Sequence, residues 1–479
     1  MEQERGISVA ATALEMEYEG YRINLLDTPG HQDFSEDTYR TLLAVDSAVM
    51  VLDAAKGIEP QTEKLFRVCR QRRIPIITFI NKMDQQSRDP LELLDELESL
   101  LDITPVAFNW PVGDGPWFKG VYDLRGNRVL TYERTARGQR RAPVEVADLH
   151  DPAVNQLLGE DFAHRLREDI HLLTATGTPF DTDLFLQGDV TPVFFGSALN
   201  NFGLDPFLEA LLELAPPPRP RKSNRGTVDP TENGFTGLVF KIQANMDRKH
   251  RDRMAFVRVC SGRFSRDMTV RHARLGRDIR LSRAFRLFGR EREPIDEAFP
   301  GDVIGIVSPG LFAIGDTVTS GQPLTFPEIP RFAPERFGTL LNADINRHKQ
   351  FQKGLRQLEE EGAAQILHAA GHVRRQPIVA VVGELQFDVV LARLKDEYGV
   401  EARIERLPYA HARWIEGPPQ ALERIVLPSR DGMRCLDRHE QTVLLFESSW
   451  ALQYCQKENP DLSFIEMSAD AAPGEDVTA

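Results

Sequence analysis

The sequence predicts an α/β fold in which a doubly wound sheet domain with an inserted subdomain is followed by a β-barrel and an α+β domain. In the first part of the chain, short apolar runs alternate with helical patterns, as in a parallel sheet covered on both faces. After a linker come short alternating strands with turn signals, and then a mixture of helices and strands. A chain of 479 residues is long enough for roughly three such domains.

The first domain is expected at residues 1–215. Strands are expected at 21–27, 48–54, 74–80 and 191–197. Helices are expected at 59–72 and 90–102. The second helix begins at Pro90, a favoured first-turn residue, and carries acidic residues early. Residues 103–190 have a different texture, with glycines between short strand-like pieces and a helical run from Glu160 to Leu173. We interpret them as an inserted subdomain.

The remaining residues divide by composition. Residues 216–234 are rich in Pro, Gly and polar residues and are expected to be a linker. We expect a β-barrel at 235–329, with strands at 235–242, 301–308 and 314–320, and an α+β domain at 330–460, with helices at 344–360 and 385–397. Residues 461–479 end in a small, acidic stretch and are expected to be a disordered tail.

Charge and composition exclude several classes of protein. The formal net charge of −14 argues against a general nucleic-acid coat but allows a local basic face. The four cysteines form no C-x-x-C pair, so neither a disulfide framework nor a zinc site is indicated. The N-terminal residues are charged where a signal peptide is apolar, and the apolar runs are too short to span a membrane. We therefore expect a cytoplasmic protein.

Two short motifs stand at the carboxyl ends of expected strands. They are Asp27-Thr28-Pro29-Gly30-His31 and Asn81-Lys82-Met83-Asp84. Each is weak evidence alone, because D-x-x-G occurs by chance about once in a chain of this length and either motif could be an ordinary turn or solvated loop. Their order and their positions, however, are those of ligand-binding residues in open α/β sheets.

These residues suit the two ends of a guanine nucleotide. The carboxylate of Asp84 can accept hydrogen bonds from the ring N–H and the exocyclic amine of guanine, which adenine does not present together. Asp27 can hold a magnesium ion, directly or through water, and Gly30 lets a backbone N–H approach the terminal phosphate. The tripeptide Ser197-Ala198-Leu199 would supply further backbone donors for the base, although by itself it could be an ordinary helix start.

The ordered motifs resemble the P-loop GTPase domain of ribosomal translation factors, and longer segments resemble the bacterial release factor 3 family. The GTPase-domain resemblance also includes Arg5-Gly6-Ile7-Ser8 and Gln32-Asp33-Phe34, and the segments that resemble release factor 3 are 35–42, 110–115, 241–253 and 383–390. The resemblance extends from residue 1 to about 455. It implies a ribosome-dependent GTPase of translation termination that promotes the release and recycling of class-one peptide chain release factors, and a monomer that binds GTP or GDP with magnesium.

The resemblance also implies roles for individual residues. Ser8 corresponds to the switch hydroxyl that ligates magnesium, and His31 to the residue that positions the attacking water. Asn81 and Lys82 would support the base beside Asp84. Gly30 would be the pivot through which loss of the terminal phosphate reaches the following segment, an order–disorder switch.

The family's phosphate-binding sequence, G-x-x-x-x-G-K-[ST], occurs nowhere in the 479 residues. The resemblance places it on a first strand and helix upstream of Arg5, so we expect an N-terminally truncated chain or a mis-assigned start, with Met1 an internal methionine. Nucleotide affinity should fall on the order of ten-thousandfold or more. The strand is central in such sheets, so its neighbours are expected to carry unpaired backbone groups.

Two alternative functions remain open at this point. The chain could be a non-catalytic ribosome-binding protein with a decayed GTPase domain, although the joint presence of Asp27, His31, Asn81 and Asp84 speaks against decay. It could also be a different translational GTPase, such as a ribosome protection protein, against which the segment 241–253 argues.

Two basic runs are candidates for contact with ribosomal RNA or protein. They are Arg248, Lys249, His250, Arg251 and Arg253, and Arg347, His348, Lys349 and Lys353. The alternative for both is a solvated surface kept charged against aggregation.

Overall fold

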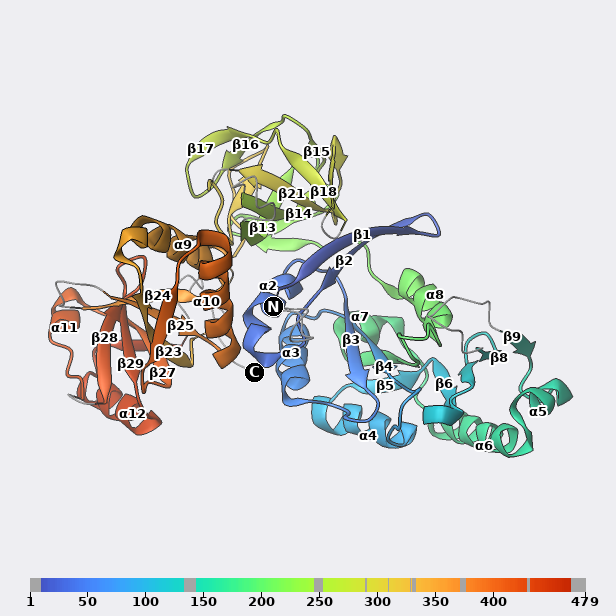
Figure 1. Cartoon of the computed structure of the whole chain (residues 1–479). Coiled ribbons are helices and arrows are strands. Elements are labelled where there is room, and N and C mark those ends of the chain that lie inside the picture. The colour runs from blue at the N-terminus through green and yellow to red at the C-terminus, as the bar shows by residue number, and fades with distance from the viewer. Residues whose placement is uncertain are drawn as a thin grey trace. The chain divides into compact units, whose positions relative to one another are not determined.

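A computed structural model describes most of the chain, and the statements below concern the residues that it describes. These residues are 10–132, 144–244, 253–288, 291–308, 310–327, 329, 333–370, 376–428 and 431–466. They divide into two compact units, which are described separately (Figure 1). One unit is Val45–Pro217, and the other combines the residues before it with those after it.

The centre of the unit Val45–Pro217 is a four-stranded parallel sheet in the order β3-β4-β10-β5. Its strands are β3 (Ala48–Asp53), β4 (Ile76–Asn81), β5 (Thr104–Ala107) and β10 (Val190–Phe195). Its helices are α3 (Pro60–Gln71), α4 (Pro90–Leu101), α7 (Thr182–Gln187) and α8 (Leu204–Leu214). β10 is buried throughout and β4 up to its last residue, as in the middle of a doubly wound sheet. The predicted α/β fold is confirmed here.

An antiparallel sheet, β6-β7-β8-β9, lies between β5 and β10 in the chain. Its elements are β6 (Asn109–Val112), η2 (Gly115–Trp117), β7 (Gly120–Asp123), β8 (Arg128–Thr131), β9 (Val144–Ala147), α5 (Pro152–Leu158) and α6 (Glu160–Thr176). The buried Asn109 side chain exchanges two hydrogen bonds with the backbone of Phe195. The expected insertion at 103–190 began too early, because β5 pairs with β10 in the main sheet.

β3 is an edge strand, since β4 is its one neighbour among the described residues. Val49 and Val51 are 39% and 58% exposed. Among the described residues, the strand therefore presents an unpaired backbone edge and exposed apolar side chains.

The first described strands do not belong to this parallel sheet. β1 (Thr12–Tyr18) and β2 (Tyr21–Asp27) form an antiparallel hairpin in the other unit, where β1 also pairs with β18 (Ala284–Phe288). The interpretation of 21–27 as a strand of the parallel sheet was therefore wrong.

The side chains of β2 explain the difference. Arg22 lies 3.1 Å from the buried carboxylate of Glu15, and Asn24 bonds both the carboxylate of Asp302 and the N–H of Val303. The run is thus not apolar throughout, and its polar residues bind barrel residues. Burial raises the pKa of Glu15, although Arg286 and Arg22 oppose the shift.

The barrel strands form one sheet in the order β17-β16-β22-β13-β14-β21-β18-β1-β2, with β19 beside β18. The further strands are β13 (Thr236–Ala244), β14 (Arg253–Ser261), β15 (Phe264–Ser265), β16 (Thr269–His272), β17 (Arg277–Arg280), β19 (Glu291–Pro294), β20 (Glu297–Ala298), β21 (Val303–Ser308) and β22 (Thr317–Thr319). β21 and β22 fall within two of the expected strand regions, and β13 covers most of the third, 235–242, and ends two residues beyond it. The core includes Phe235, Val257 and Ile304.

The expected linker at 216–234 is partly ordered. β11 (Arg221–Ser223) and β12 (Gly226–Val228) pair with each other, so the composition missed a small two-stranded sheet.

The last part of the chain contains an eight-stranded sheet in the order β26-β23-β25-β24-β28-β29-β27-β30. Its strands are β23 (Arg336–Asn342), β24 (Gln365–Ala369), β25 (Pro377–Val381), β26 (Ala402–Arg406), β27 (His411–Glu416), β28 (Gly432–Leu436), β29 (Thr442–Phe446) and β30 (Ser463–Ile465). Its helices are η3 (Ile345–Arg347), α9 (His348–Glu360), α10 (Glu384–Tyr398), α11 (Pro419–Glu423) and α12 (Ser449–Glu458). α9 and α10 pack against each other and share one core with the sheet (Figure 1).

The α+β character expected of this part is present, and both expected helices form. The disorder expected from residue 461 was wrong at its start, because β30 pairs with β27. The rest of that segment, from 467 on, lies outside the described residues. Within the described ranges, no helix is both long and apolar enough to cross a membrane. All four cysteines lie among the described residues and are buried, and none of them forms a disulfide.

Candidate functional site

Asn81 joins two loops at the carboxyl edge of the parallel sheet. It is the last residue of β4, and its Oδ1 accepts hydrogen bonds from the backbone N–H groups of Lys82 at 2.8 Å and Ala198 at 2.9 Å. The amide oxygen therefore holds the N-K-M-D and S-A-L segments together. The structure brings these predicted base-side residues to one place.

Asp84 lies beside them with half of its carboxylate engaged. Its Oδ2 accepts a hydrogen bond from Asn200 Nδ2 at 2.9 Å, and the same nitrogen donates to Ser197 Oγ at 3.2 Å. Its Oδ1 makes no hydrogen bond to the described residues and is free to accept one from a base. Sequence reasoning missed Asn200, although it directly follows the S-A-L segment.

Lys82 connects the ends of two neighbouring strands. Its Nζ lies 2.7 Å from Oδ2 of Asp53, the last residue of β3, and its backbone has a φ of 69°. Burial raises the pKa of Asp53, but hydrogen bonds from Lys82, Ala55 and Lys56 outweigh it, so that the pKa is lowered. The same contact raises the pKa of Lys82. Sequence reasoning missed Asp53, whose place at the end of an apolar run was a usable signal.

The loop after β10 is closed by its own backbone. Ser197 and Phe202 exchange two N–H···O hydrogen bonds of 2.9 Å. A Cβ on Gly196 would lie 2.3 Å from the carbonyl oxygen of Phe202, so only glycine fits there. The N–H groups of Ser197 and Ala198 therefore both have protein partners in this structure, Phe202 and Asn81. Leu199 is 78% exposed, and its N–H makes no hydrogen bond to the described residues.

Met83 has a structural role. Its side chain is fully buried, and its N–H donates to the carbonyl of Gly196 at 3.1 Å. Its carbonyl accepts from Gly115 at 2.8 Å. The side chain thus anchors the N-K-M-D loop and is withdrawn from any ligand.

The residues from Asp27 to His31 belong to the unit that contains the barrel. Asp27 ends β2 with an exposed side chain, and Thr28 is half-buried. Pro29 is buried, and its carbonyl accepts a hydrogen bond from Thr38 Oγ1 at 3.3 Å. A Cβ on Gly30 would have no atom within 4 Å, so there is open space for a ligand group.

His31 is oriented by its neighbour Asp33. The Nδ1 of His31 accepts the N–H of Asp33 at 3.2 Å and lies 3.5 Å from its Oδ1. Because Nδ1 is an acceptor, the neutral ring carries its proton on Nε2.

The helix α2 (Ser35–Leu42) that follows is anchored to two other parts of its unit. Asp37 accepts hydrogen bonds from Lys241 Nζ of the barrel at 2.9 Å and from the N–H of Ala11 at 2.6 Å. Arg40, which pairs with a glutamate one turn earlier, donates to the carbonyl of Gly362 at 3.3 Å. Burial raises the pKa of Asp37, but Lys241 and Ala11 outweigh it and the pKa is lowered.

The sequence predicts two magnesium ligands, Ser8 and Asp27. Ser8 lies outside the described residues. Among those described, no three His, Cys, Asp or Glu side chains are grouped as metal ligands. The exposed carboxylate of Asp27 is an oxygen donor of the kind that magnesium prefers, and such sites usually take their other ligands from phosphate and water. The carboxylate of Asp27 is therefore a suitable ligand for magnesium.

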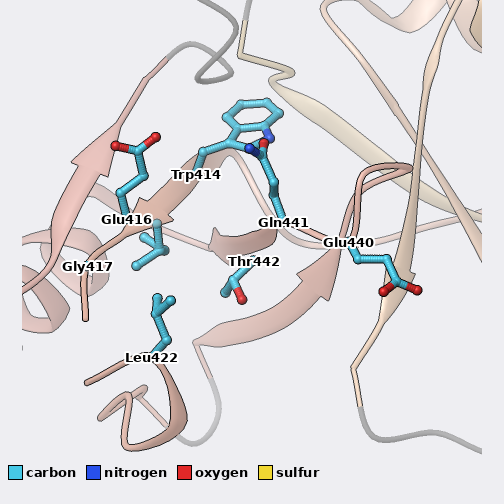
Figure 2. A pocket seen from close by; sticks show the side chains of 8 residues that line it. Trp414, Glu416, Gly417, Leu422, Glu440, Gln441 and Thr442 are labelled. Atoms are coloured by element: carbon cyan, nitrogen blue, oxygen red, sulfur yellow. The ribbon is translucent and has the colours of Figure 1, made fainter. Parts of the chain in front are cut away.

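One cavity, of about 330 Å³, lies between β27, α11 and the start of β29 (Figure 2). Its lining residues are Trp414, Ile415, Glu416, Gly417, Leu422, Glu440, Gln441 and Thr442. Figure 2 shows the carboxylates of Glu416 and Glu440 pointing away from Leu422 and Thr442. The lining contains no Lys, Arg or His to neutralise a phosphate, so this cavity does not suit a nucleotide.

Three protein-family models match successive parts of the chain. The Elongation factor Tu GTP binding domain matches residues 1–217, Elongation factor G domain 2 matches 234–321, and the C-terminal domain of Class II release factor RF3 matches 326–456. Peptide chain release factor 3 of Cyanothece sp. is 53% identical over 465 residues, covering 96% of this chain and 85% of its own. The chain belongs to the peptide chain release factor 3 family.

Other relatives agree. Peptide chain release factor 3 of Gloeobacter violaceus is 51% identical, with 98% of this chain and 88% of the relative covered. A crystal structure from Thermus thermophilus has a TM-score of 0.67 at 20% identity and covers 87% of this chain. This chain covers 64% of that one, and the likeness shows the fold alone. Release factor 3 is thus a translation-termination GTPase family with a guanine-nucleotide domain and a ribosomal site of action, as the resemblance implied.

Proposed function

We propose that this release factor 3 homologue uses the N-K-M-D and S-A-L loops to recognise guanine and the Asp27–His31 segment to act on the terminal phosphate. The observation that carries the base-side assignment is the half-engaged carboxylate of Asp84. Asn200 fixes one oxygen and leaves the other for the guanine N–H groups. Asn81 and Lys82 hold this loop in place but need not touch the base themselves.

At the phosphate end, Asp27 would hold magnesium, directly or through water, together with Ser8 and the nucleotide. The ion would neutralise charge on the phosphates. His31 would position the attacking water with its Nε2 edge, since Nδ1 is held by Asp33. Gly30 leaves room for the terminal phosphate, whose loss would release the segment after it.

The contacts of that segment support a conformational timer. Asp37 forms a hydrogen bond with Lys241 of the barrel. Asp33 and Arg40 form hydrogen bonds with the α+β part of the chain that contains α9 and α10, called the third domain below. A change at Gly30 would therefore be felt by both accessory domains through α2. We propose that this movement, made on the ribosome, promotes the dissociation of class-one release factors, and that the protein acts as a cytoplasmic monomer.

The test is a titration with fluorescent GDP. The 479 residues lack the phosphate-binding sequence, so they should bind on the order of ten-thousandfold more weakly than a chain that also carries G-x-x-x-x-G-K-[ST] before residue 1. In the extended chain, Asp84→Asn should lose guanine affinity and gain affinity for xanthosine diphosphate. An oxygen replaces the exocyclic amine there, and the Asn amide can donate to it.

Two outcomes would contradict the assignment. If the extended chain did not bind GDP, the alternative of a non-catalytic ribosome-binding protein would replace the GTPase proposal. If Asp84→Asn kept its preference for guanine over xanthine, the base would be recognised elsewhere. Asp114→Asn, on a nearby loop, serves as the charge-matched control.

A further inference from the structure

Of the two basic runs, one is exposed in the structure. The first run lies outside the described residues except for Arg253, which pairs with Glu360. The second begins before α9 and continues along it. Its members Lys349 and Lys353 are exposed, as is Arg356, which the sequence analysis did not single out.

Lys349, Lys353 and Arg356 form a stripe on α9. They are spaced i, i+4 and i+7, which places them on one helix face over about 10 Å. The opposite face packs Phe351, Leu355 and Leu358 into the core of the third domain. Core packing of that face thus leaves the stripe on the exposed side of α9.

The three cations are not neutralised by the fold. Among the residues that the structure describes, no carboxylate lies within ion-pair distance of any of them. The acidic residues at the end of α9 are engaged elsewhere, because Glu360 pairs with Arg253 and Glu361 lies 3.0 Å from Arg393 on α10. Glu360 and Glu361 therefore pair with arginines of the protein, whereas the three cations of the stripe are exposed to solvent.

This arrangement opposes the helix dipole. The first turn of α9 contains basic residues and no acidic one, while the acidic residues follow at its carboxyl end. Both placements are unfavourable for an isolated helix, since anions are preferred at the amino end and cations at the carboxyl end. A charge arrangement that opposes the helix dipole and has no compensating contact is typical of a functional surface.

We propose that Lys349, Lys353 and Arg356 bind the phosphate backbone of a double-helical segment of ribosomal RNA. The net charge of −14 disfavours unspecific attraction to nucleic acid, so a stripe of three unpaired cations is a local exception. Flexible Lys and Arg side chains along a helix match phosphates without reading bases. The inference rests on the ribosomal function proposed above and names the surface that meets the RNA.

The test compares the full chain with the variant Lys349→Gln/Lys353→Gln/Arg356→Gln. Binding to a fluorescein-labelled RNA duplex and to vacant ribosomes is measured by anisotropy and by pelleting over a range of salt concentrations. The slope of log affinity against log salt should fall in magnitude by about one for each phosphate that the protein no longer neutralises, so by about three in the variant.

The matched control is Lys395→Gln/Arg403→Gln/Lys457→Gln, which removes three exposed cations from the same domain. Two of them already lie near carboxylates, Lys395 beside Glu401 and Arg403 beside Glu405. The control should keep the wild-type slope within about one unit. The variant Lys349→Arg/Lys353→Arg, which keeps the charge, should bind as the wild type does.

The proposal would be overturned if the triple variant kept the wild-type salt dependence, or if the control lost as much. It would also be overturned if the variant lost the RNA duplex but bound ribosomes as before. Binding is measured without nucleotide, so a failure of GDP binding in the titration above is a separate result.

Discussion

Oδ2 of Asp33 accepts a hydrogen bond from the backbone N–H of Leu385 at 2.7 Å. Leu385 is the second residue of α10, and the first N–H groups of a helix have no partner inside it. Gly383, just before the helix, has no side chain to cap them, whereas Gln386 bonds back to the N–H of Gly383 at 3.1 Å. A carboxylate from beside His31 thus caps a helix of the third domain.

We expect Asp33→Ala to destabilise α10 by about 1–2 kcal/mol, because the N–H of Leu385 loses its acceptor. Hydrogen exchange measures this directly, and the amides at the start of α10 should exchange about tenfold faster. Those of α12, which Asp33 does not contact, should be unchanged. Unaltered exchange at Leu385 would show that the hydrogen bond contributes nothing.

Gly383→Ala should disturb the same contact from the other side. A Cβ on Gly383 would lie 2.0 Å from Cγ of Asp33, so one of the two must move. Unfolding measurements should show a loss of about 1–3 kcal/mol. In an Asp33→Ala background the loss should be smaller, because the two changes share one contact. Gly321→Ala, where the nearest atom is 3.9 Å away, is the control, and additive effects would argue against a shared contact.

Asp37→Asn should lower stability in a pH-dependent way. The pKa of Asp37 in the folded chain lies below its ordinary value of 3.8, so the charged form stabilises the fold above that pH. Removing the charge leaves Lys241 buried without its partner, at a cost of about 3 kcal/mol near pH 7.

The difference between wild type and Asp37→Asn should begin to shrink as the pH falls below 3.8, where the carboxyl of the unfolded wild type binds a proton. It should be lost once the pH falls through the lower pKa of the folded chain, because the folded carboxyl is then protonated as well. Urea unfolding at a series of pH values checks this. Asp278→Asn, at an exposed ion pair on β17, should differ from wild type by less than about 1 kcal/mol. A difference that stays constant down to the lowest pH would mean that folding does not lower the pKa of Asp37.

Val51→Lys should reduce self-association of the 479-residue chain. Val51 is 58% exposed on the edge strand β3, and exposed apolar edges pair with other chains. Light scattering at increasing concentration should show less aggregate than for the wild type. Leu100→Lys changes a comparably exposed residue on α4 and should have little effect. Equal improvement by both variants would point to net charge and not to the strand edge.

The fold was predictable wherever one physical signal dominated. Pro90, with Asp89 accepting the N–H of Leu91, marks the start of α4 as local capping rules predict. β2 was not assigned to the right sheet, because Leu25 and Leu26 suggested burial on both faces, while Arg22 pairs with Asp302 and Asn24 bonds Val303 in the barrel. Those partners lie far along the chain, and no local pattern identifies them.

The candidate site shows the same division. Asn81 and Asp84 were identifiable because their residue types and strand-end positions follow from the chemistry of guanine. Asn200 and the use of the Ala198 N–H were not, since both depend on how two loops close on each other. The hydrogen bond from the Leu385 N–H to Asp33 could not be predicted from the sequence either, because it joins residues that are far apart in the chain.

The barrel-containing unit is interrupted in the chain by all of Val45–Pro217. As the protein emerges during its own synthesis, the hairpin β1–β2 must therefore wait for its barrel partner β18. At bacterial elongation rates of about 5–20 residues per second, the delay is on the order of ten seconds or more. During that time the hairpin has no sheet to join, and a two-stranded hairpin alone is marginal in water. The nascent chain thus carries an unassembled strand pair that a chaperone could bind until β18 has been synthesised.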